Sequence, residues 1–179
     1  MDKDQRISPD ALTDFAFSAL RALGAEEKAA RATAEVFVGA DLRGISSHGV
    51  AGGTGLIETI ERVRAGAIII NAQPEVNRKE NWALATMDAK GGLGPSAAMD
   101  AAHLAGDIAD EFGYGKVYVR DANHFGATCV YVEALTARGF AGRATCTSGA
   151  WMIPFGGDRI RLGTNPITWG VPCGGQPIV

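Results

Sequence analysis

One histidine of this chain has the surroundings that acid–base chemistry needs. His124 lies in the stretch Asp121–Gly126, between a β-like run at Lys116–Val119 and a helical pattern that starts near Ala127. In such a strand-to-helix turn, Gly126 lets backbone amides approach a ligand, and the unperturbed pKa of histidine lies near neutrality. The same ring could simply cap the helix or satisfy the turn, and this stretch alone favours that structural interpretation.

A second histidine, His48, follows Ser47 and precedes Gly49 at the predicted start of a helix. Ser47 could cap that helix and do nothing more, since serine is a preferred N-cap residue. For chemistry, His48 and His124 would have to meet across the fold. The periodicity of the sequence does not show whether they do.

The first part of the chain is predicted to be helical. Apolar residues recur at helical spacing, and serine, proline and glycine mark the ends of the helices. We therefore expect a helical domain over residues 1–66. Its predicted helices run from Pro9, behind Ser8, to Gly24; from about Glu26 to Leu42; and from a cap at Ser46 or Ser47 to Gly66.

After Gly66, extended segments alternate with helices. This alternation predicts an α+β, α/β-like fold in which helices pack on a mixed sheet, over residues 67–179. No GxGxxG segment joins a strand to a helix, so the sheet is not expected to be a Rossmann fold. The predicted extended segments are 67–76, 82–88, 116–119, 143–147 and 167–171, and the predicted helices are 95–112 and 127–138.

The composition argues against several classes of function. The 179 residues carry a net charge of -3, which gives no electrostatic case for binding nucleic acid or an anionic membrane. No apolar run approaches the ~20 residues of a membrane span, and residues 1–6 lack the apolar region of a signal peptide. Cys129, Cys146 and Cys173 form no CxxC pair and indicate a reduced, cytoplasmic setting. No metal site is expected from three histidines and scattered cysteines.

Four segments together resemble the malate/L-lactate dehydrogenase family, which has a non-Rossmann cofactor fold. They occur in the family's order and at its spacing over essentially the whole chain. Each match alone is weak, but the four together are specific. The segments are Ala40–Gly49 (ADLRG-x-x-SHG), Asn123–Gly126 (NHFG), Pro154–Gly157 (similar to PWGG) and Leu162–Ile167 (LGTNPI).

The resemblance implies an oxidoreductase that transfers hydride between NAD or NADP and a 2-hydroxy/2-keto acid or a related imino acid. It also implies a homodimer. Hydride transfer from an alcohol needs a base for the hydroxyl proton, and the reverse reaction needs an acid. The resemblance implies that Ser47 and His48 form a catalytic pair and that His124 is the proton acceptor. The residues implied at the cofactor are His124, Phe125, Gly126, Ala127, Thr128 and Ser148. Thr164 is implied at the substrate, with the alternative that its hydroxyl only bonds the backbone of the turn.

The sequence departs from the family's pattern in two places. Gly52 stands where the family usually has an arginine that binds the substrate carboxylate. The small residues Gly52–Gly55 would leave room for a substrate group that is uncharged or bulkier, so simple malate or lactate is expected to be used poorly. An arginine at Gly52 would restore a charged partner and is expected to improve the use of 2-keto acids, unless the glycine-rich loop places it badly. The resemblance also ends at Val179, about halfway along family members, which implies a truncated part of the enzyme. The alternative is a non-catalytic remnant of this fold that acts in binding or assembly.

Overall fold

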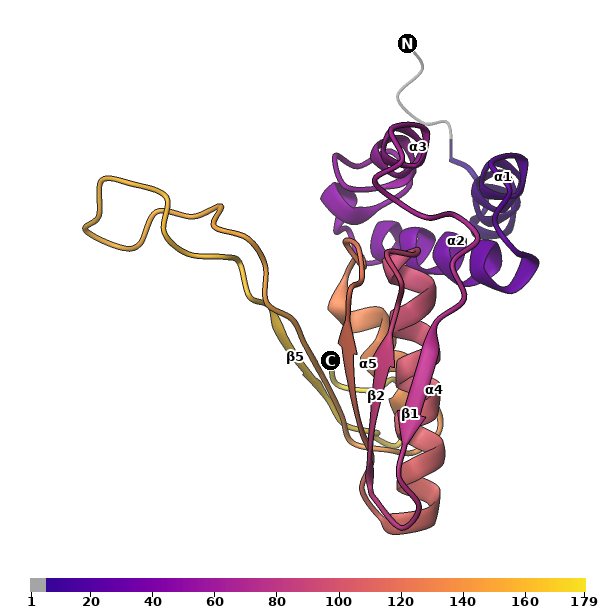
Figure 1. Cartoon of the computed structure of the whole chain (residues 1–179), viewed down its shortest axis with the longest axis vertical. Coiled ribbons are helices and arrows are strands. Elements are labelled where there is room, and N and C mark those ends of the chain that lie inside the picture. The colour runs from indigo at the N-terminus through magenta and orange to yellow at the C-terminus, as the bar shows by residue number, and fades with distance from the viewer. Residues whose placement is uncertain (1–5) are drawn as a thin grey trace.

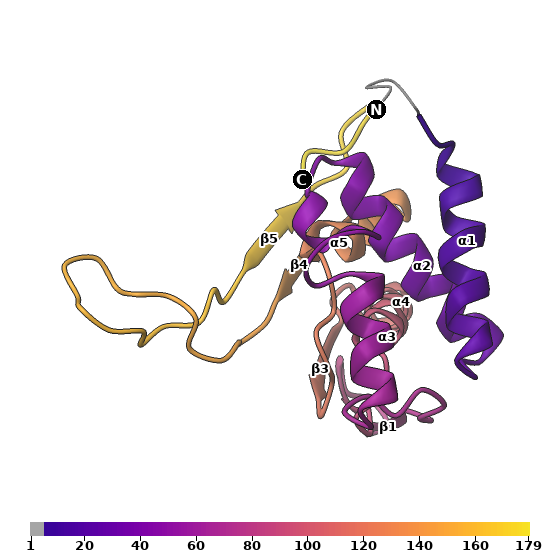
Figure 2. The same ribbon diagram turned by 90° about the horizontal axis from the view of Figure 1, so that it is seen from above.

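The computed structural model describes residues 6–179, which form a helical layer, a small sheet backed by helices, and a projecting two-stranded arm (Figure 1). Residues 1–5, which belong to the segment without a signal-peptide pattern, lie outside this range. The turned view shows the arm leaving the body on the side away from α1 (Figure 2). Among residues 6–179, no helix has both the length and the apolar character that a membrane crossing requires.

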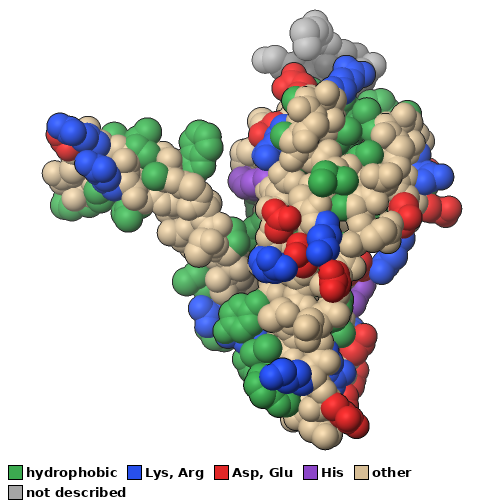
Figure 3. Space-filling view, in the orientation of Figure 1, with side chains coloured by type: hydrophobic (Ala, Val, Ile, Leu, Met, Phe, Trp, Pro, Cys, Tyr) green, Lys and Arg blue, Asp and Glu red, His purple; other side chains and the backbone are tan. Residues whose placement is uncertain are grey.

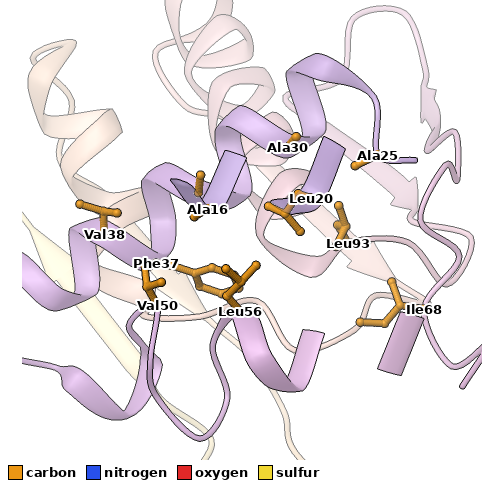
Figure 4. Packing of buried hydrophobic residues seen from close by; sticks show 11 residues of the cluster. Ala16, Leu20, Ala25, Ala30, Phe37, Val38, Val50, Leu56, Ile68 and Leu93 are labelled. Atoms are coloured by element: carbon orange, nitrogen blue, oxygen red, sulfur yellow. The ribbon is translucent and has the colours of Figure 1, made fainter. Parts of the chain in front are cut away.

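The N-terminal layer consists of three helices: α1 (Pro9–Ala22), α2 (Glu27–Leu42) and α3 (Leu56–Arg64). The Ser8 hydroxyl oxygen accepts a hydrogen bond from the Ala11 N–H at 3.2 Å, which confirms the predicted cap of the first helix. The apolar faces of the helices meet in one core (Figure 4). Its buried members include Ala16, Leu20, Ala34, Phe37, Val50, Leu56 and Leu93.

The start that the sequence predicts for the third helix is wrong. Ser46–His48 forms a short 3₁₀ turn, and α3 begins only at Leu56, behind Gly55. In the described part of the chain, no serine side chain caps α3. The seven residues between the turn and the helix are rich in glycine and fold into a tight loop, which the periodicity of the sequence could not distinguish from a helical turn.

The sheet is mixed, as predicted. Its strands are β1 (Glu75–Arg78), β2 (Leu84–Asp88) and β3 (Lys116–Arg120), in the order β1-β2-β3. β1 runs antiparallel to β2, and β3 runs parallel to it. Helix α4 (Gly94–Phe112) connects β2 to β3 and packs on one face of the sheet (Figure 1). The predicted extended segment 67–76 is strand only from Glu75 onward.

The C-terminal part begins with α5 (Thr128–Ala137) and continues into an antiparallel pair, β4 (Gly142–Thr145) and β5 (Ile167–Gly170). This pair forms a sheet of its own and is the base of the arm, residues 146–166 (Figure 1). The arm leaves many apolar side chains exposed, among them Trp151, Ile153, Phe155 and Ile160. These elements together confirm the predicted α+β fold.

Candidate active site

Asp41, near the end of α2, holds the turn that carries His48. Its Oδ2 atom accepts a hydrogen bond from the Val50 N–H at 2.9 Å. A β-carbon at Gly49 would lie 1.8 Å from Asp41 Oδ1, so only glycine lets the carboxylate come this close. The acid of the ADLRG segment therefore fastens the chain directly after His48.

Ser47 and His48 are joined through their side chains. The Ser47 hydroxyl oxygen lies 2.8 Å from Nδ1 of His48. The Ser47 carbonyl oxygen accepts hydrogen bonds from the backbone N–H and the hydroxyl of Thr54, at 3.2 Å and 3.0 Å. The partner of the Ser47 hydroxyl is thus an imidazole, and the returning loop fixes the backbone beneath it.

Asn123 fixes the turn that carries His124. Its Nδ2 donates to the carbonyl oxygens of Gly91 and Gly92 at 2.8 Å and 3.0 Å. Its Oδ1 accepts a hydrogen bond from Arg62 Nη2 at 2.8 Å. One half-buried amide therefore ties together three segments that lie far apart in the sequence: α3, the β2–α4 loop and the β3–α5 loop.

Two glycines let neighbouring segments close on the His124 turn. A β-carbon at Gly94, the first residue of α4, would lie 2.3 Å from the His124 carbonyl oxygen. Gly126 has φ +77, and a β-carbon there would lie 2.7 Å from Val36. Larger residues at either position would push the turn away from α2 or α4.

The fold brings the two histidines together. The ring centroids of His48 and His124 lie 5.2 Å apart, with the ring planes inclined by 40°. Figure 3 shows histidine side chains at the surface of the upper body, on the side toward the arm. Ser47 and His124 are exposed and His48 is partly buried, so the three residues form one cluster with access to solvent.

The surroundings of His124 lower its pKa. Partial desolvation is the largest cause, and the nearby charge of His48 acts in the same direction. The carboxylate of Glu58 raises the pKa, and the guanidinium of Arg62 lowers it again. The fold therefore favours the neutral ring of His124.

Hydrogen-bond partners distinguish the two rings. The Gly126 N–H donates to Nδ1 of His124 over 3.4 Å, so the neutral ring carries its proton on Nε2. The Ser47 hydroxyl can either donate to or accept from Nδ1 of His48. His48 is therefore satisfied in both tautomers, whereas the neutral His124 presents Nε2–H as a donor.

The segment expected at the cofactor uses its side chains within the fold. The Phe125 ring stacks on Tyr131 with centroids 5.4 Å apart, and the Phe125 carbonyl oxygen accepts a hydrogen bond from the Tyr131 hydroxyl. Ala127 and Thr128 are buried, and the Thr128 hydroxyl pairs with that of Thr168 in β5. The groups of this segment that remain free to bind a ligand are therefore mainly those of the backbone.

Ser148 and Thr164 pair with each other across the arm. The Thr164 N–H donates to the Ser148 hydroxyl oxygen at 2.9 Å, and the two hydroxyl oxygens lie 3.2 Å apart. The Ser148 N–H donates to Oδ1 of Asn165 at 2.9 Å. Within residues 6–179, no hydrogen bond joins this pair to the histidine cluster, so the expected site residues fall into two separate groups.

Gly52 does not have the room that the sequence suggested. A β-carbon at this position would lie 2.3 Å from the Ser46 carbonyl oxygen and 2.5 Å from that of Ser47. Both contacts are with backbone, which cannot swing aside. An arginine at Gly52 would therefore have to push the backbone of Ser46 and Ser47 aside, which favours the poor placement that the sequence left open. The expected gain in the use of 2-keto acids stays a prediction.

Asn123, Glu58 and Arg62 are residues that the sequence pattern did not single out. The late start of α3 explains why Arg62 was missed, because the tight loop returns this residue to the histidines. A signal for Asn123 was present, since this amide side chain directly precedes His124 in the NHFG motif.

Throughout the described residues, no group of three or more His, Cys, Asp and Glu side chains is placed to hold a metal ion.

Comparison with known proteins supports one family. The sequence pattern described as malate/L-lactate dehydrogenase matches residues 7–179. The chain is 33% identical over 174 residues to a malate dehydrogenase of Pyrococcus abyssi, covering 97% of this chain and 47% of that protein. It is 32% identical over 176 residues to a ureidoglycolate dehydrogenase (NAD(+)) of Escherichia coli, covering 97% and 49%.

The fold agrees with the sequence comparison. The chain is similar to the structure of malate dehydrogenase from Pyrococcus horikoshii OT3, with a TM-score of 0.90 and 30% identity, over 99% of this chain and 50% of that one. The chain therefore spans about half the length of the curated relatives it matches.

Proposed function

Because the chain belongs to the malate/L-lactate dehydrogenase family, we propose that the protein is an oxidoreductase that transfers hydride between NAD or NADP and a 2-hydroxy/2-keto acid or a related imino acid. The observation that carries this proposal is the 5.2 Å separation of the His48 and His124 rings. Hydride transfer to or from a carbon bearing oxygen requires a proton to move at that oxygen. Two imidazoles at one solvent-accessible point suit that requirement.

Ser47, His48 and His124 are the proposed catalytic residues. In reduction, Nε2–H of the neutral His124 donates a hydrogen bond to the substrate oxygen. In oxidation, His124 accepts the hydroxyl proton only in the tautomer that gives up the long contact with the Gly126 N–H. His48 takes up or releases a proton without such a change, since the Ser47 hydroxyl adapts to either tautomer.

The turn before α5 fits a nicotinamide cofactor, which when bound would supply or receive the hydride. In the described part of the chain, no side chain caps the N-terminus of α5. The N–H groups of its first turn therefore favour an anionic acceptor such as a phosphate. We propose that the backbone of residues 124–128 and the hydroxyl of Ser148 hold the cofactor, and that Thr164 contacts the substrate.

The wider organisation is also proposed. Residues 1–66 act as a helical domain that supplies Ser47 and His48, and residues 67–179 act as the domain that supplies His124 and the cofactor contacts. The protein works as a homodimer in the cytoplasm, with a small molecule as its substrate. Supporting this are the resemblance to the family and the three cysteines without a close pair.

The test begins with cofactor binding. Purified protein is titrated with NADH and NADPH by nicotinamide fluorescence, and oxidation of the bound cofactor is followed with pyruvate, oxaloacetate and a cyclic imino acid. Because the chain spans about half of its relatives, it is expected to bind the cofactor weakly and to turn over little by itself. Saturable binding of NADH or NADPH supports the proposal, and turnover with one of these substrates would strengthen it. Absence of cofactor binding contradicts it and favours a role in binding or assembly, for which the exposed apolar arm would be the first place to look.

Variants separate the two histidines. In a version of the protein with the full length of its relatives, His48→Gln and His124→Ala should each lower turnover by about two to four orders of magnitude, the usual contribution of a general acid–base group. His124→Gln keeps an N–H donor but cannot titrate, so it should recover part of the reduction rate if donation is the role of that ring. Turnover within a few-fold of the unmodified protein in both His124 variants would rule out any direct role.

A further inference from the structure

We propose that Arg62 binds the carboxylate of the substrate, in place of the arginine that would be expected at Gly52. This inference rests on the proposed function, because it names the group that selects acids at the same site. The carboxylate of a 2-keto acid is attached directly to the carbon that reacts. The group that binds it must therefore lie beside the residues that move the proton.

Arg62 lies beside them. Its Nη2 donates to Oδ1 of Asn123 at 2.8 Å, and Asn123 directly precedes His124. The charge of Arg62 also acts on His124, as does that of Glu58 one helical turn earlier. The guanidinium thus lies at the edge of the histidine cluster, in the second turn of α3.

The tight loop after His48 is what brings Arg62 to this point. The Leu56 N–H donates to the Val50 carbonyl oxygen at 3.1 Å, and the Gly55 N–H donates to that of Gly52 at 3.0 Å. Val50 and Leu56 are both buried in the core around Phe37 (Figure 4). Both ends of the loop are therefore anchored at one place, and α3 starts next to the turn that carries His48.

Arg62 keeps donors for a ligand. Within residues 6–179, the bond to Asn123 is the one hydrogen bond that its guanidinium makes. Nη1 of Arg62 lies 3.7 Å from Oε1 of Glu58, which is an ion pair longer than a hydrogen bond. A guanidinium has five N–H groups, and two on one edge match a carboxylate. The half-exposed side chain can therefore take a second, bidentate partner.

Other candidates for this role are occupied or misplaced. Arg43 forms an ion pair with Glu133 of α5 and so holds α2 to α5. Arg64 is exposed and lies two residues beyond Arg62, on a different side of α3. Gly52 has no space for a side chain. Arg62 is the arginine whose contacts place it at the histidines.

Glu58 then acts as a competitor. A substrate carboxylate must displace the loose interaction between Arg62 and Glu58, and it is also repelled by the Glu58 charge. Removal of the Glu58 charge should therefore strengthen the binding of an acid, and removal of the Arg62 charge should weaken it. A purely structural Arg62, which only holds Asn123, predicts no gain from a change at Glu58.

The experiment measures pyruvate binding to the protein without cofactor. Pyruvate is added in steps, and the ring-proton NMR signals of the histidines are followed to saturation. Pyruvamide, which lacks the carboxylate charge, is the control ligand. We expect Arg62→Gln to weaken pyruvate binding about tenfold or more, Glu58→Gln to tighten it several-fold, and Arg64→Gln, the matched control on the same helix, to leave it unchanged.

The variants also separate folding from binding. Arg62→Lys keeps the positive charge and should retain part of the affinity even if the contact with Asn123 is altered. Pyruvate binding that is unaffected by Arg62→Gln, or equal binding of pyruvamide, overturns the proposal, as does the absence of any pyruvate-dependent shift in the unmodified protein. Arg62-dependent pyruvate binding in a protein that binds neither NADH nor NADPH would instead contradict the proposed function and leave the carboxylate site standing.

Discussion

The backbone of Ser46 lies so close to Gly52 that a β-carbon on Gly52 would come within 2.3 Å of the Ser46 carbonyl oxygen. Gly49 and Gly55 are packed as tightly, against Asp41 and against the Gly49 carbonyl oxygen. Gly53 has open space around its α-carbon. Glycines three residues apart are therefore what allows this loop to close under the Ser47–His48 pair.

The loop gives a first prediction. Gly52→Ala should displace the Ser46–His48 turn, lower the free energy of unfolding by about 1–3 kcal/mol as overpacking does, and reduce turnover. Gly53→Ala is the matched control and should change neither. Denaturant unfolding and steady-state kinetics on both variants make the comparison. Equal stability and equal turnover of the two variants would show that the loop accommodates a β-carbon at Gly52 without cost, and would contradict the prediction.

A second prediction concerns the titration of His124. Its pKa should lie below the ordinary value for histidine, because desolvation and the His48 charge disfavour the imidazolium. Arg62→Gln should raise this pKa, and Glu58→Gln should lower it further. NMR titration of the ring protons, assigned with His48→Gln and His124→Gln, provides the measurement. Shifts of the opposite sign would contradict the described placement of these charges.

The same shift links pH to stability. The unfolded chain protonates His124 at its ordinary pKa, whereas the folded chain does so only at lower pH. Unfolding therefore takes up a proton in the interval between the two values, and acidification through that interval destabilises the fold. Above the ordinary pKa the ring is neutral in both states, and its contribution no longer changes with pH.

A third prediction tests whether the hydrogen bonds of Asn123 stabilise the turn that carries His124. Asn123→Ala removes its three hydrogen bonds and leaves carbonyl oxygens of the β2–α4 loop without a donor. We expect a loss of about 1–3 kcal/mol in the free energy of unfolding. Asn77→Ala, at an exposed position of the edge strand β1, should change it by less than about 0.5 kcal/mol. Urea unfolding gives the free energy of unfolding of each variant, and an equal loss in Asn123→Ala and Asn77→Ala would contradict the prediction.

A fourth prediction uses two buried threonines. Thr33 of α2 is fully buried, and its hydroxyl has no hydrogen-bond partner among residues 6–179. Thr33→Val should raise the free energy of unfolding by about 1 kcal/mol, because an unsatisfied polar group leaves the core. Thr59 of α3 is buried too, but its hydroxyl donates to the Gly55 carbonyl oxygen at 2.9 Å. Thr59→Val should therefore be neutral or destabilising, and stabilisation by both changes would refute the reasoning.

Local signals predicted most of the elements. Ser8 and Pro9 marked the start of α1, and the alternation of strands and helices after Gly66 gave the mixed sheet and its covering helices. These features depend on capping chemistry and on the period of apolar residues, which act over a few residues. The same kind of signal placed His124 correctly between β3 and α5.

What the sequence could not give depends on packing between distant segments. The sequence predicted only that the small residues Gly52–Gly55 leave room. The role of the glycines at 49, 52 and 55 is visible only when the opposing backbone is in place. The contact of Arg62 with Asn123 likewise requires that α3 and the β3–α5 loop meet. Close backbone approach leaves no periodic trace in a sequence, so neither the loop nor the position of Arg62 could be derived from spacing.

The projecting arm has a consequence for local stability. Residues 146–166 contribute nothing to the buried clusters that hold the helices and the sheet together, and apart from their ends they are joined mainly to one another. Opening of the arm therefore need not disturb the body, so its amides should exchange with deuterium far sooner than those of α2, which is protected by the main core. Two well-separated exchange regimes within one chain would follow from this geometry alone.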